Sequence, residues 1–185
     1  KAVLKTGAVK RIYASPDVAE KLLVVCGDTE IVSVMSDIFT DEEVKTESVS
    51  ASSPADIYKY KERAKYGEWR LNIYNSLSVK EYKNLECVTL SPELNLTEIR
   101  TVAEHTDGIQ TEIIGYGHLP LMIMKNCPVK AMGKCQNGKD LYQLRDRKGM
   151  KFPIICQKDC RALLLNSKPI YTADMTDEIR KTKVD

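Results

Sequence analysis

Residues 111–124 read TEIIGYGHLPLMIM, and they follow the pattern of a buried β-strand that runs on into a loop. The apolar run from Leu119 to Met124 is the longest in the chain and has the length of a core strand. It is far shorter than the roughly 18–20 residues that a membrane-spanning helix needs. We therefore predict that this stretch belongs to the core of a sheet and that the protein has no membrane partner.

Strand and helix patterns alternate on the N-terminal side of this stretch. Short apolar runs predict strands at residues 11–14, 31–35, 69–74 and 87–90. Helices are expected at residues 16–23, 55–66, 78–82 and 97–103, the last of them capped by Asn95 or Thr97. Residues 48–54 fit either an edge strand or a loop, residues 163–171 fit a strand or an extended segment, and a final helix begins at Thr176. Repeated strand–helix units predict an α/β fold with a parallel sheet and helical crossovers.

Four of the six cysteines fall in residues 127–160. They are Cys127, Cys135, Cys156 and Cys160, in the pattern C-x7-C-x20-C-x3-C. Thiolates are soft ligands, and four of them complete either a tetrahedral zinc site or an iron–sulfur cubane. The segment therefore predicts a metal or cluster site. The spacing fits neither a standard zinc finger nor the ferredoxin run, so it does not select the metal.

Three alternatives to a metal site stay open for these cysteines. Disulfides need an oxidising compartment, and isolated buried thiols behave as small apolar side chains. A site that has lost its metal is the third. Cys26 and Cys87 show how scattered cysteines look in this chain, and the clustering of the other four favours a metal. Six cysteines without a secretory segment predict a cytoplasmic location.

A series of short motifs runs from residue 71 to residue 169. They are Leu71-Asn72-Ile73-Tyr74-Asn75-Ser76, Val88-Thr89-Leu90-Ser91-Pro92-Glu93-Leu94-Asn95, Glu112 with Gly117 and Leu119, Met122, Cys127-Pro128, Leu144 with Asp146-Arg147 and Gly149, Phe152-Pro153, Cys156 with Cys160, and Leu165-Asn166-Ser167-Lys168-Pro169. In order and spacing they resemble the U32 peptidase family, also called the collagenase-like protease family. The resemblance covers residues 70–175 well and the first 70 weakly.

The resemblance implies an incomplete TIM-type (β/α) barrel and a single domain over residues 1–185. The family's usual signature has a small residue and a cysteine soon after the strand glycine. Here His118 and Pro120 occupy those places, and the first cysteine of the cluster is Cys127. The chain also opens at Lys1 in what reads as the middle of a helix. Both features point to a fragment or second module of a longer family member, whose remainder would be a partner.

The resemblance also implies what the four cysteines do. Cluster-bearing members of the family are implied to act in oxygen-independent hydroxylation of RNA bases or of a quinone precursor. We therefore expect the four cysteines to bind a 4Fe-4S cluster, with zinc or no metal as the alternatives. The family name implies a second hypothesis, a peptidase with a protein substrate. A third is a non-catalytic binding module.

Three carboxylate or imidazole side chains are candidates for acid–base chemistry. Glu93 follows a predicted strand, where β/α scaffolds carry active sites, although a helix-entry turn accounts for it equally simply. Glu112 and His118 are evenly spaced on one predicted strand and could form an acid–base pair, or His118 could be a satisfied core residue. Residues 145–147 could bind an anion, or form a solvated turn that ends at Gly149. The net charge of +2 does not by itself require a nucleic-acid partner.

Overall fold

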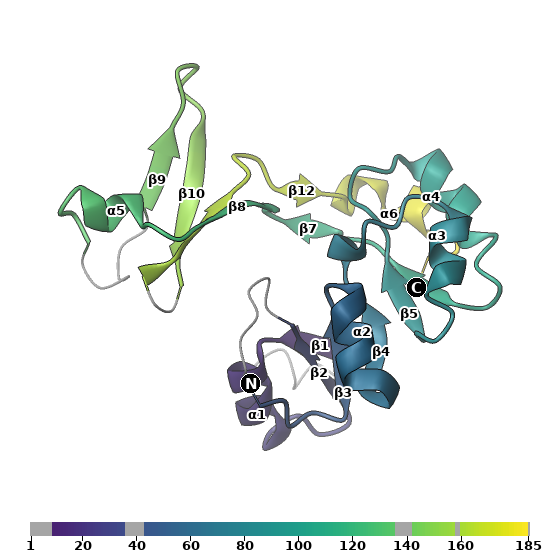
Figure 1. The fold of residues 1–185 in the computed structure, drawn as a ribbon. Coiled ribbons are helices and arrows are strands. Elements are labelled where there is room, and N and C mark those ends of the chain that lie inside the picture. The colour runs from purple at the N-terminus through teal and green to yellow at the C-terminus, as the bar shows by residue number, and fades with distance from the viewer. Residues whose placement is uncertain (1–8, 36–42, 136–141, 158–159, 185) are drawn as a thin grey trace. The chain divides into compact units, whose positions relative to one another are not determined.

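The chain divides into two compact units. The structure is a computed structural model that describes residues 9–35, 43–135, 142–157 and 160–184. The first unit comprises Lys1–Ile113 and Asp177–Asp185, and the second comprises Ile114–Thr176 (Figure 1). The helix expected at Lys1 lies outside the described residues. Each unit has a sheet of its own.

The first unit is built on a six-stranded parallel sheet. Its strands lie side by side in sequence order and the sheet curls into a half-barrel. They are β1 (Arg11–Ala14), β2 (Glu30–Val34), β3 (Ser48–Ala51), β4 (Ala64–Gly67), β5 (Cys87–Thr89) and β6 (Gln110–Glu112). Every neighbouring pair is parallel. The prediction of an α/β fold with a parallel sheet is confirmed.

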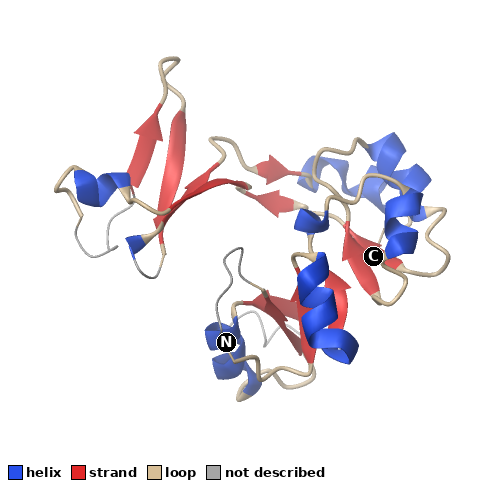
Figure 2. Ribbon diagram, viewed as in Figure 1, coloured by secondary structure: helices blue, strands red, loops and turns tan. Residues whose placement is uncertain are grey.

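Helices connect these strands and begin at residues that favour helix starts (Figure 2). They are α1 (Pro16–Leu23), α2 (Pro54–Tyr60), α3 (Ser76–Glu81) and α4 (Leu96–Ala103), whereas α6 (Thr176–Arg180) comes after the last strand of the chain. At α4 the side chain of Asn95 accepts hydrogen bonds from the backbone of Thr97 and Glu98, while the Glu98 side chain accepts a hydrogen bond from the Asn95 amide. This capping box satisfies backbone N–H groups that have no partner inside the helix. The cap of this helix is therefore Asn95, one of the two predicted residues.

The core of the first unit lies between the sheet and its helices. Ile73, Val79, Val88 and Leu90 are fully buried there. A smaller cluster of Val32, Tyr66 and Cys87 packs separately, with one residue from each of β2, β4 and β5. Cys87 is thus a core thiol, as expected of an isolated cysteine.

Two predictions in the middle of the first unit are wrong. The helix expected at residues 55–66 ends at Tyr60, because Lys61 adopts a positive φ of 42°. A short 3-10 helix, Lys61–Arg63, then leads into β4. The strand expected at residues 69–74 is a short 3-10 helix, Trp69–Leu71. The strand at this place in the sheet is β4, which ends at Gly67. Gly67 lies so close to Leu71 that an added Cβ would be 2.7 Å from Leu71 Cδ1. Residues 48–51, left open between strand and loop, form the fully buried β3.

The second unit contains an antiparallel sheet that the sequence did not indicate. Its strand order is β8-β11-β10-β9, and a separate two-stranded ribbon pairs β7 with β12. The elements are β7 (Tyr116–Gly117), β8 (Pro120–Met124), α5 (Pro128–Ala131), β9 (Tyr142–Arg145), β10 (Lys151–Cys156), β11 (Ala162–Leu165) and β12 (Ile170–Tyr171). The strand and following loop predicted for residues 111–124 are instead three short strands, β6, β7 and β8. The backbone breaks between them, and Gly117 adopts a φ of 129° that side chains disfavour.

One face of the antiparallel sheet packs against α5. Val129 of α5 is buried with Ile154, Ala162 and Leu164 of the central strands, and Cys127 joins the same cluster. This small core holds the start of α5 against the end of β10. Within the described residues, none of the helices has both the length and the apolar character required to cross a bilayer.

Candidate metal centre

All four clustered cysteines line one cavity of the second unit. The cavity has a volume of about 430 Å³, and its other lining residues are Lys130, Gln157 and Arg161. Cys127 is buried and Cys156 is partly buried, whereas Cys135 and Cys160 are exposed. The structure thus brings together residues up to 33 positions apart in the sequence. The four cysteines that the sequence singled out are the ones that gather here.

The local fold shows how the four thiols meet. Cys127 is the N-cap of α5 and is followed by Pro128, which suits the first turn of a helix. Cys135 follows the turn at Gly133, whose φ is 68°. Cys156 ends β10, and the Gln157 amide donates to the Arg161 carbonyl at 2.8 Å, which closes the loop carrying Cys160. The strand end, the helix start and two loops therefore supply one thiol each.

The thiols influence one another electrostatically. Burial raises the pKa of the Cys156 thiol, and the negative charge of the Cys127, Cys135 and Cys160 thiolates together with a hydrogen bond to Cys127 raises it further. The ammonium of Lys130 lies 3.7 Å from the sulfur of Cys160 and can donate to it. Four thiolates in one place repel each other, and a bound cation or cluster would offset this repulsion.

The four thiols can be compared with the donor sets that zinc and iron–sulfur clusters require. Among the described residues, no three His, Cys, Asp or Glu side chains are grouped so that they could hold one metal ion. A zinc ion needs its sulfurs about 2.3 Å from a single centre. A 4Fe-4S cluster is likewise held by four cysteine thiolates, but it is a larger body than a single ion. By the chemistry and number of the donors, the four thiols fit either of these groups.

Disulfides do not occupy this site. All six cysteines lie in the described part of the chain, and all six are free thiols. The Cys26 side chain belongs to the first unit and donates to the Leu23 carbonyl at 3.4 Å. It has no part in the cavity of the second unit, so it serves as a natural reference for the clustered cysteines.

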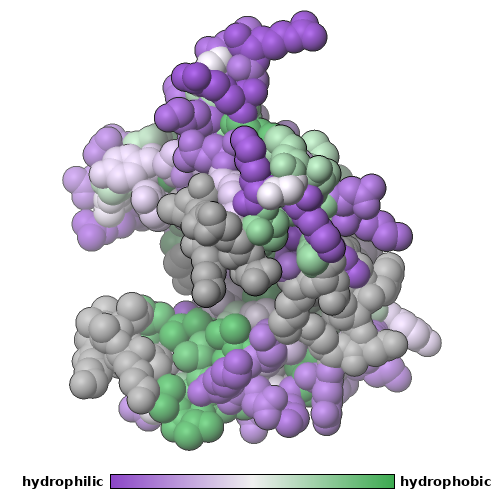
Figure 3. All heavy atoms as spheres, turned by 90° about the vertical axis from the view of Figure 1, so that its left-hand side faces the viewer, coloured by the Kyte–Doolittle hydropathy of each residue, from purple (hydrophilic) through white to green (hydrophobic). Residues whose placement is uncertain are grey.

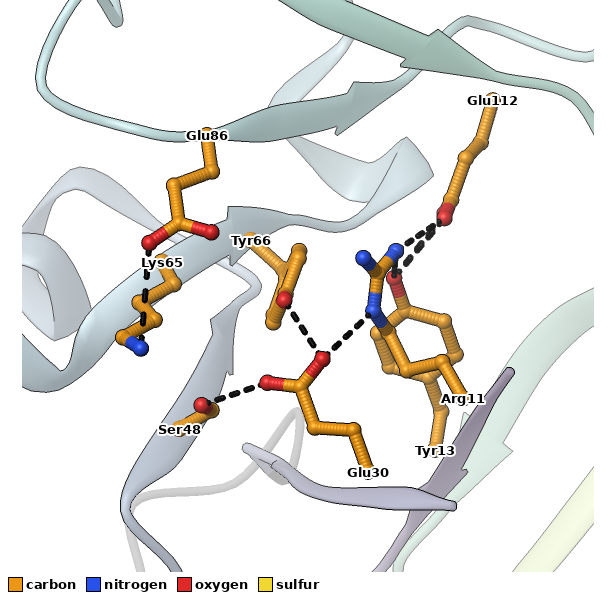
Figure 4. A network of polar contacts seen from close by, with 8 residues as sticks. All are labelled: Arg11, Tyr13, Glu30, Ser48, Lys65, Tyr66, Glu86 and Glu112. Carbon is orange, nitrogen blue, oxygen red and sulfur yellow. Dashed lines mark hydrogen bonds and ion pairs between the residues drawn. The ribbon is translucent and has the colours of Figure 1, made fainter. Parts of the chain in front are cut away.

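A second polar cluster, which the sequence did not reveal, lies in the half-barrel (Figure 4). Arg11 of β1 donates from Nε to Glu30 of β2 at 3.1 Å and from an outer nitrogen to Glu112 of β6 at 2.7 Å. The Tyr13 hydroxyl also donates to Glu112, at 3.0 Å. The guanidinium carbon of Arg11 lies 3.9 Å from the centre of the Tyr66 ring. These contacts join the first and sixth strands, which are not neighbours in the sheet.

Hydrogen bonds keep the carboxylate of Glu30 ionised in this cluster. Burial works to raise its pKa, but hydrogen bonds from Ser48, Tyr66 and Arg11 and the charge of Arg11 outweigh burial and hold the pKa below the usual 4.5. Ser48 and Tyr66 each donate to it at 2.7 Å. Burial, followed by the neighbouring carboxylate, raises the pKa of Tyr66 and of Tyr13, so both phenols stay protonated donors. The donors and acceptors are matched, which indicates a structural cluster.

The acid–base candidates fall in different places. Glu112 contacts Arg11 and Tyr13 in the half-barrel. His118 lies in the second unit outside any strand, and its Nδ1 is 2.6 Å from the Asn166 carbonyl oxygen. The premise that both residues share one strand is wrong, because β6 ends at Glu112. Glu93 is exposed on the turn after β5, where its amide donates to the Ser91 hydroxyl at 3.4 Å. The other histidine, His105, bonds through Nδ1 to the Thr101 carbonyl.

Comparisons with known proteins identify no relative. No family model matches the chain, no curated protein is significantly similar to it, and no solved structure resembles it at a significant level. Function is therefore inferred from the fold and from the cysteine cavity.

Proposed function

We propose that the protein is a U32-like domain whose four clustered cysteines bind a 4Fe-4S cluster that supports oxygen-independent hydroxylation of RNA. The observation that carries this proposal is the cavity lined by Cys127, Cys135, Cys156 and Cys160. The curled parallel sheet of the first unit supports it, because such a half-barrel is consistent with an incomplete TIM-type barrel. When bound, a 4Fe-4S cluster supplies one-electron transfer.

The residues of the cavity have distinct roles in this proposal. The four thiolates would hold the cluster. Lys130 and Arg161 place positive charge at the same cavity, which would attract the negatively charged assembly of four thiolates and a cluster. Cys127 sits at the start of α5 and is buried in the small core, so it anchors the site there. A hydroxyl group whose oxygen comes from water is added with the loss of two electrons and two protons (R–H + H2O → R–OH + 2 H+ + 2 e−). The exposed Cys135 and Cys160 lie where the cluster would pass these electrons on to a redox partner that acts as the acceptor.

The distribution of charge favours RNA over a quinone precursor as the substrate. The second unit carries eleven Lys and Arg residues against four Asp and Glu residues, a net charge of +7. The first unit carries seventeen against twenty-two, a net charge of −5. The near-neutral total of the chain thus conceals one strongly basic unit, and that unit is the one with the cysteine cavity. A basic surface attracts the phosphates of a nucleic acid, whereas an aromatic quinone precursor gains little from it.

The proposal is tested in cells that grow without oxygen and produce the protein. RNA from these cells is digested to nucleosides and compared by mass spectrometry with RNA from cells that produce the Cys156→Ser variant. We expect a nucleoside heavier by one oxygen atom with the unaltered protein and its loss with the variant. The control is Cys26→Ser, which changes a cysteine outside the cavity and should leave the modified nucleoside in place.

Two results would contradict the proposal. One is RNA without any added oxygen in cells with the unaltered protein, together with gelatin cleavage by the purified chain, which would favour the peptidase hypothesis. The other is equal modification with the unaltered protein and with Cys156→Ser, since the cysteines would then be irrelevant to the reaction.

A further inference from the structure

The tip of the β9–β10 hairpin concentrates positive charge that is not neutralised. Arg145 and Lys151 lie directly opposite each other in the antiparallel register. Arg147 and Lys148 stand in the turn between them, and all four side chains are exposed. Like charges opposite each other on neighbouring strands destabilise a hairpin. An arrangement that costs stability in this way indicates a negatively charged partner.

The only carboxylate of this turn is engaged by the backbone. Asp146 Oδ1 accepts hydrogen bonds from the amides of Lys148 and Met150, each at 2.8 Å. In the part of the chain that the structure describes, none of the four cations forms an ion pair. The contact found for their charged groups is Arg145 Nε donating to the Gly149 carbonyl at 3.4 Å. The cations are thus available to a ligand.

The turn holds these cations on a defined backbone. The Gly149 amide donates to the Asp146 carbonyl at 3.1 Å, and the Asp146 amide donates to the Met150 carbonyl at 3.0 Å. Gly149 has a φ of 83°, as three-residue hairpin loops with a left-handed glycine require. Figure 3 shows hydrophilic side chains projecting at the top of the view, where the β9–β10 hairpin stands in Figure 1. A preorganised turn loses little backbone entropy when it binds.

The same unit exposes an aromatic pair. Tyr116 of β7 and Tyr171 of β12 are 75% and 56% exposed, and their rings meet edge to face with centroids 6.2 Å apart. Because the two exposed rings are adjacent, they form a continuous aromatic surface that a partner can cover. Unpaired nucleic-acid bases stack on such rings, whereas paired bases already stack on each other.

We propose that the β9–β10 hairpin binds the phosphate backbone of single-stranded RNA, and that Tyr116 and Tyr171 offer the stacking surface for its bases. The choice of RNA as the polyanion rests on the proposed function. The hairpin is a binding element that positions the nucleic acid and reads no sequence, because phosphate contacts are alike at every nucleotide.

The test compares two triple variants of the full chain. In the first, Arg147, Lys148 and Lys151 are each replaced by Gln, which spares Asp146 and the turn. In the control, the exposed Lys10, Lys21 and Lys83 of the first unit are each replaced by Gln, which removes the same charge. Binding of a fluorescently labelled single-stranded RNA of about 20 nucleotides, longer than most single-domain sites, is measured by anisotropy over a range of salt concentrations.

We expect the hairpin variant to bind at least about tenfold more weakly than the unaltered chain at low salt. The slope of log affinity against log salt should shrink by about 2, since each lost phosphate contact removes about 0.7. The control should change both quantities little. A Tyr116→Ala variant should weaken binding to the RNA more than to a duplex of the same length.

Several outcomes would overturn the inference. They are no binding of the RNA by the unaltered chain, equal loss in both triple variants, and equally tight hairpin-dependent binding to vesicles of phosphatidylserine and phosphatidylcholine. Iron content is measured in every sample, so that a failure of the cluster proposal can be told apart from a failure of the RNA-binding proposal. A hairpin variant that retains iron and binds RNA normally refutes this inference alone. A chain that never acquires iron refutes the cluster while the hairpin result stands by itself.

Discussion

Arg11 connects two carboxylates that are far apart in the sequence. Glu30 and Glu112 lie on either side of its guanidinium group, and Glu112 is 101 residues away. The side chains of all three are mostly shielded from solvent. Removing the cation would leave two partly buried negative charges facing each other, which is the costly way to break an ion pair. The cluster therefore contributes to the curl of the sheet and has a testable energetic role.

The first prediction concerns Arg11→Met. The variant should lower the free energy of unfolding of the first unit by about 1–3 kcal/mol, because it keeps apolar bulk but leaves the carboxylates unpaired. The measurement is urea unfolding followed by the fluorescence of Trp69, the single tryptophan, which lies in this unit. The control is Lys45→Met, whose ion pair with Glu20 is exposed, and it should cost less than about 1 kcal/mol. An equal effect of both changes would contradict a special role for Arg11.

The second prediction concerns the pH dependence of stability. Because the folded protein holds the pKa of Glu30 below the usual 4.5, this group stabilises the fold above that pH. Its contribution is lost as the pH falls through the lowered value. The Glu30→Gln variant should therefore lose less stability than the unaltered chain between about pH 6 and about pH 3.5. Glu81→Gln, which changes an exposed residue, should follow the unaltered chain. Parallel curves for all three proteins would refute this role of Glu30.

Helix starts were predictable from the sequence, and strand boundaries were less so. Local hydrogen bonds fix a start such as that of α4, where Asn95 and Glu98 act within one turn. Strand residues are chosen by partners that are remote in sequence. Trp69–Leu71 looks like a strand by its alternation, yet the sheet uses the less apolar Ala64–Gly67, because Gly67 packs closely against Leu71, Leu85 and Val88. Such contacts between distant residues leave no local pattern.

The third prediction is that Asn95→Ala lowers the free energy of unfolding of the first unit by about 1 kcal/mol, because two backbone amides of α4 lose their acceptor. Asn95→Asp should cost much less, since a carboxylate accepts the same bonds and suits the positive end of the helix. Thermal unfolding measured by circular dichroism compares the two. If Thr97→Ala proves more damaging than Asn95→Ala, the assignment of the cap is wrong.

The two units differ in how well the sequence predicted them. The alternation of strands and helices predicted the parallel sheet, and cysteine clustering predicted which residues share a cavity. The antiparallel sheet of the second unit was missed. Its pairing brings β8 next to β11, about 40 residues later, and places β9 at the edge. Strands this short in a glycine- and proline-interrupted segment give no clear period. The Arg11 cluster was missed for a similar reason, since its members lie on several different strands.

The division of charge between the units adds a property that total composition conceals. The net charge of the whole chain is +2, whereas the second unit alone carries +7. Charge separation on this scale governs association with polyanions and not the fold. The cysteine cavity and the basic hairpin lie in the same positively charged unit. The proposed cofactor site and the proposed RNA-binding site are therefore parts of one unit.

Iron and acid-labile sulfide analysis of the full chain, purified without oxygen, tests the central claim most directly. We predict roughly four irons and four sulfides per chain, loss of both in Cys156→Ser, and unchanged amounts in Cys26→Ser. One zinc ion without sulfide, or four free thiols without metal, would contradict the claim that the four cysteines hold an iron–sulfur cluster.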